Sequence, residues 1–248
     1  MNTIMKKLKI DINADVGEGM GNELELFPFI SSCSIACGGH IGDQQSMNAI
    51  VELAKRFKLK IGAHPSFDDK KNFGRKILKI KKDKLIDSLE SQVKSLIQIL
   101  NKNKIKLNHI KPHGALYNLA ANDKKTALIM IGLANKYNTK LYVPYGSLIS
   151  KLALNEGIRI CNELFIDRNY NDDFTLVSRN NKNALIQDSK KIFNHVNLII
   201  NKKTILTINK KNISVAFDTL CIHGDNPKAV QLMKNLFLTF EENGLKIN

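Results

Sequence analysis

Short apolar runs alternate with longer amphipathic segments along most of the chain. Residues 43–57 carry apolar side chains three and four positions apart, the spacing of one helix face, with Asp43 as the expected N-cap. Similar spacing predicts helices at 83–100, 123–137, 146–156, 184–196 and 227–242. The runs between them predict strands at 8–14, 33–38, 60–63, 106–111, 140–143, 158–161 and 215–222. This order predicts parallel strands joined by helices.

Polar motifs recur where these apolar runs end. They are KIDINADVGEG (9–19), SIACGGHIGD (34–43), KIGAHP (60–65), NHIKPHGALYN (108–118), CNELFIDR (161–168) and LCIHGDNP (220–227). An open doubly wound sheet gathers such groups at one switch point, whereas every strand of a closed β/α barrel ends at the same mouth. The six strand ends therefore favour a closed or nearly closed barrel, with an open sheet as the alternative. Residues 204–218 break the alternation and predict a hairpin around Lys210 and Lys211.

Length and composition favour one globular domain over residues 1–248. Apolar residues make up 43% of the chain and charged residues 25%, which is typical of soluble proteins. No apolar run approaches the roughly 18 residues of a membrane helix, and the start lacks a secretory pattern, so we expect a cytoplasmic protein with no membrane contact. The four cysteines show no zinc or disulfide spacing, which indicates a reducing compartment.

The net charge of +15 raises the question of nucleic-acid binding. Nearly all of the basic residues are lysines, spread over predicted helices and loops, and aromatic residues do not interleave with them as a stacking platform requires. We therefore expect a solvated basic surface and no nucleic-acid partner. Three of the five arginines, Arg75, Arg168 and Arg179, lie in polar loops near the motifs, where a guanidinium fork could bind an anion.

The first motif predicts a carboxylate cluster. Strand alternation places Asp11, Asn13 and Asp15 on one face, and three polar residues entering a core are costly unless they are paired or bound to something. Together with Glu18 they could act as a general base or hold a cation. The alternative is an edge strand with a solvated face.

The middle motifs add histidines and a lysine. His40 and Asp43 lie in a glycine-rich segment where backbone can approach a ligand closely, and His64 ends a strand. Lys111 and His113 are two positions apart and point to the same side of an extended segment. A Lys and a His that converge on one pocket depress each other's pKa, which suits proton transfer near neutral pH.

The last two motifs repeat this theme. Glu163, Asp167 and Arg168 follow one strand, and His223 and Asp225 follow another. Side chains from all of these strand ends are expected to share one site.

A bound metal or nucleotide remains open on sequence grounds. The suitable ligands for a divalent ion are Asp11, Asp15, His40, His64 and His113, but their spacing matches no closed local motif. The chain has no Walker glycine loop, so any ATP would bind by another mode or on a partner.

Six motifs taken in order resemble the LamB/YcsF lactam-utilisation family, which contains the A subunits of 5-oxoprolinases. They are IDINADVGEGMG, IACGGHIGD, GAHPSFDDKKNFGR, IKPHGALYN, DRNYNDDFTLVSR and CIHGDNP. The similarity runs from about residue 8 to 243. The family usually has Phe-His-Ala where this chain has Gly39-His40-Ile41, and Gly where it has Ser66, departures that bear on substrate range.

The resemblance implies an irregular β/α barrel similar to the seven-stranded glycoside hydrolase and polysaccharide deacetylase barrels. It also implies ATP-dependent opening of 5-oxoproline to L-glutamate, with partner subunits B and C that help to handle ATP. A five-membered lactam is a resonance-stabilised amide whose ring closure is favoured by entropy, so coupling to ATP would assist its hydrolysis.

These expectations suggest a role for each candidate residue. Asp15 or Glu18 with His40 would deprotonate water, and Lys111 with His113 would stabilise an oxyanion or phosphate. The pocket would be completed by His64, Glu163 and His223, and the expected substrate or phosphate contacts are Asp11, Asn13, Asp43, Arg75, Arg168 and Asp225. Two alternatives are a metal-dependent, deacetylase-like hydrolase that needs no ATP and a non-catalytic scaffold that binds substrate. A homo-oligomer also remains open.

Overall fold

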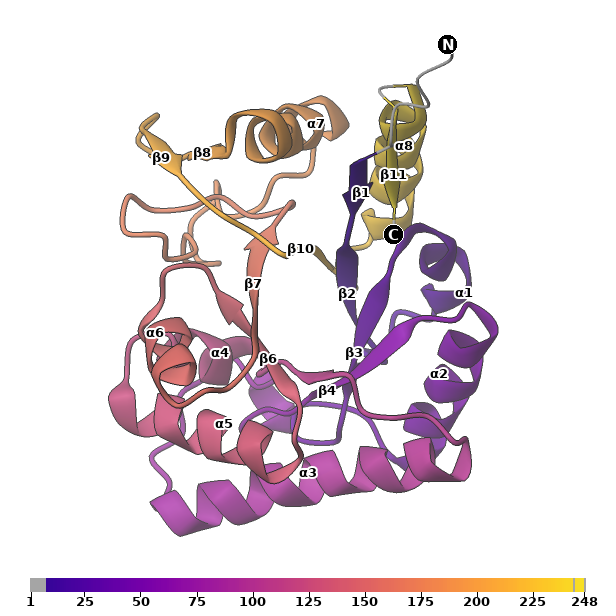
Figure 1. The fold of residues 1–248 in the computed structure, drawn as a ribbon, viewed down its shortest axis with the longest axis vertical. Coiled ribbons are helices and arrows are strands. Elements are labelled where there is room, and N and C mark those ends of the chain that lie inside the picture. Colours follow the sequence, from indigo (N-terminus) through magenta and orange to yellow (C-terminus); the bar gives the residue numbers. More distant parts are fainter. Residues whose placement is uncertain (1–7, 243, 248) are drawn as a thin grey trace.

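Seven parallel strands close into a barrel in the computed structural model, which describes residues 8–242 and 244–247. The barrel strands are β2 (Ile12–Val16), β3 (Ser32–Ala36), β4 (Lys60–His64), β5 (His109–Ile110), β6 (Lys140–Pro144), β7 (Ile160–Phe165) and β10 (Thr219–His223). Their order is β10-β2-β3-β4-β5-β6-β7, with β10 pairing with both β7 and β2 (Figure 1). The closed barrel is therefore confirmed over the open sheet.

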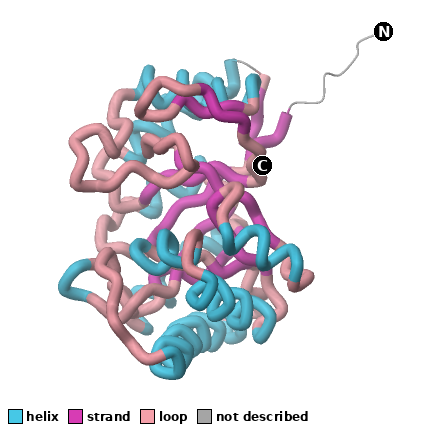
Figure 2. The backbone as a smooth tube through the Cα atoms, turned by 90° about the vertical axis from the view of Figure 1, so that its left-hand side faces the viewer, coloured by secondary structure: helices cyan, strands magenta, loops and turns pink. Residues whose placement is uncertain are grey.

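Helices surround the barrel, with the strands at the centre (Figure 2). They are α1 (Glu23–Leu26), α2 (Gln44–Arg56), α3 (Lys82–Lys102), α4 (Gly114–Ala120), α5 (Lys124–Lys136), α6 (Leu148–Asn155), α7 (Ser189–Asn197) and α8 (Ala229–Glu242). Short helical turns lie at Phe27–Phe29, Lys70–Asn72 and Leu198–Lys202. Asp43 caps α2 as predicted, because its carboxylate accepts from the backbone N–H of Ser46. Among the described residues, no helix has the length and apolar character needed to cross a membrane.

Two strand pairs lie outside the barrel. The predicted strand 8–14 is divided at Asp11, because β1 (Leu8–Ile10) pairs with β11 (Leu245–Ile247) while β2 joins the barrel. The hairpin predicted within 204–218 is confirmed as antiparallel β8 (Thr204–Leu206) and β9 (Asn212–Ser214), which lie near α7 in Figure 1.

The barrel interior is polar, whereas the outer faces of the strands are apolar. In β2, Ile12 and Ala14 are fully buried in the hydrophobic core. Inside the barrel, the ring of His109 stacks on Tyr142 at 3.7 Å and its Nε2 bonds to Ser34 Oγ at 3.0 Å. Gly62 makes room for this ring, since a Cβ there would lie 2.2 Å from it. The polar interior continues to the carboxyl ends of the strands, which form the mouth of the barrel.

Candidate active site

A cavity of about 730 Å³ opens at the carboxyl ends of the strands. The strand-end side chains that line it include Asp15, Glu18, His64, Lys111, His113, Glu163 and His223. The structure thus brings together residues from β2, β4, β7, β10 and the segment after β5, as the strand-end pattern predicted.

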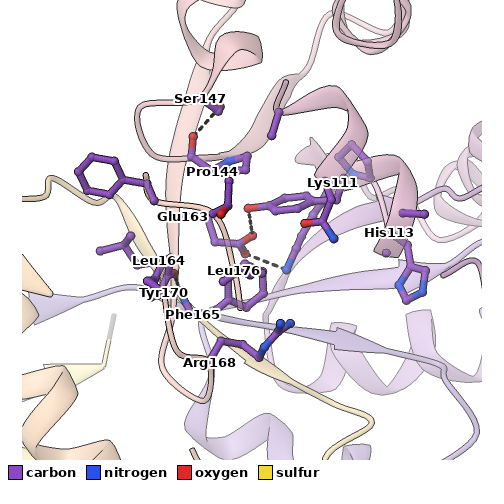
Figure 3. Close-up of a pocket in the computed structure, with 18 of the residues that line it drawn as sticks. Lys111, His113, Pro144, Ser147, Glu163, Leu164, Phe165, Arg168, Tyr170 and Leu176 are labelled. Atoms are coloured by element: carbon purple, nitrogen blue, oxygen red, sulfur yellow. Dashed lines mark hydrogen bonds and ion pairs between the residues drawn. The ribbon is translucent and has the colours of Figure 1, made fainter. Parts of the chain in front are cut away.

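Lys111 is the centre of the buried charge. Its Nζ lies 2.8 Å from Asp15 Oδ1 and 2.8 Å from Glu163 Oε1, and the side chain is 1% exposed. These two carboxylate oxygens are buried and have no hydrogen-bond partner among the described residues, so they depend on this ion pair. Figure 3 shows Lys111 and Glu163 pointing toward one another across the cavity. Tyr117 donates to the other oxygen of Glu163 at 2.8 Å.

The expected depression of the lysine pKa is wrong. Burial alone would lower the pKa of Lys111, but Asp15, the Cys221 sulfur and Glu163 all favour the ammonium and raise the pKa well above its ordinary value. Lys111 is therefore a fixed cation. It can stabilise developing negative charge, but it is not a proton donor or acceptor near neutral pH.

Two histidines face the carboxylates of Asp15 and Glu18. His64 Nε2 lies 3.0 Å from His113 Nδ1 and 3.4 Å from Asp15 Oδ2. His113 Nδ1 lies 3.3 Å from Glu18 Oε1. Burial, together with the neighbouring charge of His113, holds the pKa of His64 well below its usual value.

The hydrogen-bond partners of His64 Nδ1 and His113 Nε2, the outer nitrogens of the two rings, show where the ring protons lie. His64 Nδ1 is 2.8 Å from the carbonyl oxygen of Lys111, and His113 Nε2 is 2.9 Å from the carbonyl oxygen of Phe73. A carbonyl can only accept, so both of these nitrogens carry hydrogen. In the neutral rings, the two inner nitrogens would then present lone pairs to each other at 3.0 Å. An extra cation, either a proton or a metal ion, must relieve this contact.

The donor set fits a metal ion. One ligand atom each from Glu18, His64 and His113 lies within 4.8 Å of the others, and all three residues are buried. Two imidazoles and a carboxylate suit zinc and similar divalent ions, and the outer ring nitrogens are held by carbonyls, as ligating histidines usually are. This set shares only His64 and His113 with the set expected from the sequence. It adds Glu18 and leaves out Asp11, Asp15 and His40.

His40 supports Glu18 from behind and does not line the cavity. Its Nε2 lies 3.0 Å from Glu18 Oε1 and its Nδ1 lies 3.0 Å from Ser66 Oγ. Burial lowers the pKa of His40, while the hydrogen bond to Glu18 opposes that change. The pKa of Glu18 is well below its ordinary value, because its hydrogen bonds to His113 and His40 outweigh the effect of burial. Glu18 is therefore an anion that His40 positions.

The loop after β4 closes over the histidines. Phe73 adopts a left-handed conformation (φ 54°), which presents its carbonyl to His113, and Gly74 follows at φ +63°. A Cβ at Gly74 would lie 3.0 Å from both His113 and His40, so the loop can approach the rings this closely only with glycine there.

His223 is held from behind by a carboxylate. Its Nδ1 lies 2.9 Å from Asp167 Oδ1, and its ring stacks on Phe165 with centroids 4.7 Å apart. Asp167 is fully buried, and although burial opposes ionisation, His223 lowers its pKa. This Asp–His pair fixes the orientation of the His223 ring, and His223 lines the cavity.

Three expected site residues lie elsewhere. Asp11 precedes β2 at the opposite end of the barrel, where it pairs with Lys60 at 2.8 Å. Asp43 is exposed and serves only as the helix cap. Asn13 does not line the cavity, but it lies inside the barrel 3.3 Å from Lys111 Nζ, so it supports the lysine from below.

Two of the remaining candidates lie at the rim of the cavity and one lies inside it. Arg75 and Asp225 form an ion pair, and Arg168 lies deeper, directed into the cavity in Figure 3. Sequence reasoning did not assign a role to Tyr117, whose helix was not predicted, nor to the Phe73 carbonyl. Only the place of Tyr117 in the motif IKPHGALYN could have pointed to it.

All four cysteines are buried and free. Burial raises the pKa of Cys33, Cys37, Cys161 and Cys221. A nucleophilic thiolate is therefore not available from these side chains.

Fold and site together define a seven-stranded β/α barrel with buried acid–base groups at its mouth. Its fold resembles that of a family 4 carbohydrate esterase from Streptomyces lividans in complex with acetate. The TM-score is 0.51 at 8% identity, over 97% of this chain and 91% of that one. This likeness shows the fold alone.

The chain belongs to the LamB/YcsF family, whose pattern matches residues 10–248. It is 36% identical over 241 residues to the 5-oxoprolinase A subunit of Haemophilus influenzae (strain PittEE), covering 96% of this chain and 98% of that protein. The lactam utilization protein from Thermus thermophilus has a similar structure, with a TM-score of 0.89 and 29% identity over 97% of this chain and 99% of that one.

Proposed function

We propose that this chain is the A subunit of a 5-oxoprolinase, which hydrolyses 5-oxo-L-proline to L-glutamate with ATP in the cytoplasm. The observation that carries the proposal is the end-to-end similarity to the A subunit of the Haemophilus enzyme. The cavity with a fixed lysine, carboxylates and histidines supports hydrolysis as the reaction. Partner subunits B and C complete the enzyme and handle ATP, because this chain lacks a Walker loop.

The chemistry begins at the lactam oxygen. ATP supplies a phosphoryl group to this oxygen, which makes the ring carbon electrophilic. Water then adds to that carbon, its proton passes to a base of the site, and the ring C–N bond breaks as the nitrogen takes up a proton. A second water releases phosphate and leaves the γ-carboxylate of glutamate.

Each side chain has a role that its contacts support. Glu18, which His40 holds as an anion, is the base that orients and deprotonates water. Lys111, together with His113, stabilises the negative charge that develops on the oxygen attached to the ring carbon. Tyr117 and Glu163 keep the lysine directed into the cavity. His223, oriented by Asp167, supplies the proton for the ring nitrogen.

A metal ion at Glu18, His64 and His113 would polarise the reacting carbonyl and activate water. The facing lone pairs of His64 and His113 favour this second candidate function, a metal-dependent hydrolase that works without ATP.

The test follows glutamate release from 5-oxoproline with and without ATP, first with this chain alone and then with subunits B and C. The proposal expects release only with ATP and the partners. We expect His113→Ala to reduce turnover at least tenfold while the fold is retained, and Arg56→Gln, on the exposed face of α2, to leave it unchanged.

Other outcomes separate the alternatives. Glutamate release without ATP, lost on chelation and accompanied by one bound metal per chain, would establish the metal-dependent hydrolase. Substrate binding with turnover unaffected by His113→Ala would mean that the chain is a scaffold.

A further inference from the structure

Three arginines gather on one side of the cavity. We call Arg75, Arg168 and Arg179 the arginine cluster; all three line the cavity, Arg75 on the loop after β4 and the other two on the long loop after β7. Burial lowers the pKa of Arg168 to about 10, and the positive charges of Arg179 and Arg75 add to this effect. Three guanidinium groups this close to one another repel unless an anion lies between them.

The carboxylate of Asp225, at the rim of the cavity, lies beside two of these arginines. Asp225 Oδ2 bonds to Arg75 Nη2 and lies 3.6 Å from Arg179 Nη1. Its other oxygen, Oδ1, is buried and has no hydrogen-bond partner among the described residues. The Asp225 carboxylate therefore contacts two of the three arginines and leaves one of its oxygens without a hydrogen bond.

The deepest arginine is preorganised. Arg168 is 5% exposed, and its Nε and Nη2 donate to the carbonyls of Ala184 at 3.3 Å and Val177 at 2.6 Å. These bonds fix the plane of the guanidinium, which points into the cavity in Figure 3. A fixed guanidinium fork matches the geometry of a carboxylate or a phosphoryl group.

We propose that the arginine cluster binds an anionic oxygen group of the ligand, a carboxylate or a phosphoryl, and that Asp225 occupies the place of this group until the ligand displaces it. The proposal rests on the proposed function and deepens it, because 5-oxoproline carries a carboxylate and its activation adds a phosphoryl group. A cavity of about 730 Å³ is far larger than one lactam ring, so it has room for both groups.

If the ligand displaces Asp225, the affinity for an anion should depend on the charge of Asp225 in a predictable direction. Asp225 competes with the ligand for Arg75 and Arg179, so removal of its charge should strengthen anion binding. A simple tie between loops would behave in the opposite way, because loss of the carboxylate would release Arg75 and weaken any binding that depends on it.

The experiment is isothermal titration calorimetry on the full chain at fixed ionic strength, with inorganic phosphate, 5-oxoproline and 2-pyrrolidinone as separate titrants. The variants are Asp225→Asn and Arg179→Gln, with Arg56→Gln as the matched control, since it removes the same charge from an exposed site on α2. We expect Asp225→Asn to tighten, and Arg179→Gln to weaken, binding of at least one anion by about tenfold, the effect of one charge-assisted hydrogen bond. Arg56→Gln and the uncharged 2-pyrrolidinone should show neither change.

The titrants distinguish the source of the anion. Changes confined to phosphate assign the cluster to the phosphoryl group, and changes confined to 5-oxoproline assign it to the carboxylate. Unchanged or weaker anion binding by Asp225→Asn, or equal effects of Arg179→Gln and Arg56→Gln, would overturn the proposal. Arg179 is exposed, so its variant remains informative even if Asp225→Asn does not fold. Binding is measured without ATP or partners, so a failure of turnover in the assembled enzyme would refute the proposed function alone.

Discussion

Replacement of Lys111 by methionine should destabilise the protein more than an ordinary substitution does. Methionine keeps most of the side-chain volume but removes the ammonium that Asp15 Oδ1 and Glu163 Oε1 share at 2.8 Å. Both oxygens are buried and without a hydrogen-bond partner among the described residues. Breaking a buried ion pair from one side leaves uncompensated charge, which costs about 3–5 kcal/mol of unfolding free energy.

The pH dependence follows from the same charges. The pKa of Lys111 in the folded protein lies above its unfolded value, so its stabilising effect is complete at pH 7 and is lost only as the pH rises through the folded pKa. The wild-type protein should therefore keep this contribution from pH 5 to 8.

Urea unfolding followed by circular dichroism measures this difference. The double variant Lys111→Met/Glu163→Gln should recover about 1–3 kcal/mol relative to the sum of the single variants, because one of the stranded charges is gone. A deficit below about 1 kcal/mol at pH 7 would contradict the buried-charge explanation.

Three further predictions concern other parts of the barrel. Gly62→Ala should lower stability by about 3 kcal/mol in a thermal melt, because its Cβ would lie 2.2 Å from the His109 ring; a wild-type melting temperature would refute that packing. Asp167→Asn should cost about 1–3 kcal/mol at pH 7. Since His223 depresses the pKa of Asp167, this loss should vanish as the pH falls through that folded pKa, and a loss independent of pH in urea titrations would exclude the charged pair. Zinc at 100 times its dissociation constant should stabilise the chain by about 2.7 kcal/mol, with no such effect in His64→Ala; equal melting shifts in both would place the metal elsewhere.

Much of the fold could be predicted because the spacing of apolar residues along a strand differs from their spacing along a helix. The division at Asp11 could not, since alternation continues unbroken from Lys9 to Asp15 in the sequence while the backbone changes partner from β11 to β10 and β3. The pairing of strands in the tertiary structure determines where the predicted strand is divided. It places Asp11 at the far end of the barrel with Lys60.

Within the site, the residue types could be predicted but their protonation could not. Lys111 and His113 were expected to share a pocket, and they do. The pKa of Lys111 depends on Glu163, 52 positions away in the chain, and no local pattern encodes that distance. The orientation of His113 depends on a backbone carbonyl presented by a left-handed phenylalanine, a conformation that side-chain identity does not reveal.

Because β10 lies between β7 and β2, it also determines when the barrel can close as the chain folds during synthesis. While the chain emerges from the ribosome, six strands can assemble with two unpaired edges, and the closing strand arrives only after about nine tenths of the polypeptide has been made. Pairing of Ala14 with Ile222 then closes a loop of some two hundred residues, which is slow, and the open edges are exposed to other nascent chains until it forms. Truncation before residue 219 would therefore yield an aggregating intermediate rather than a smaller working barrel.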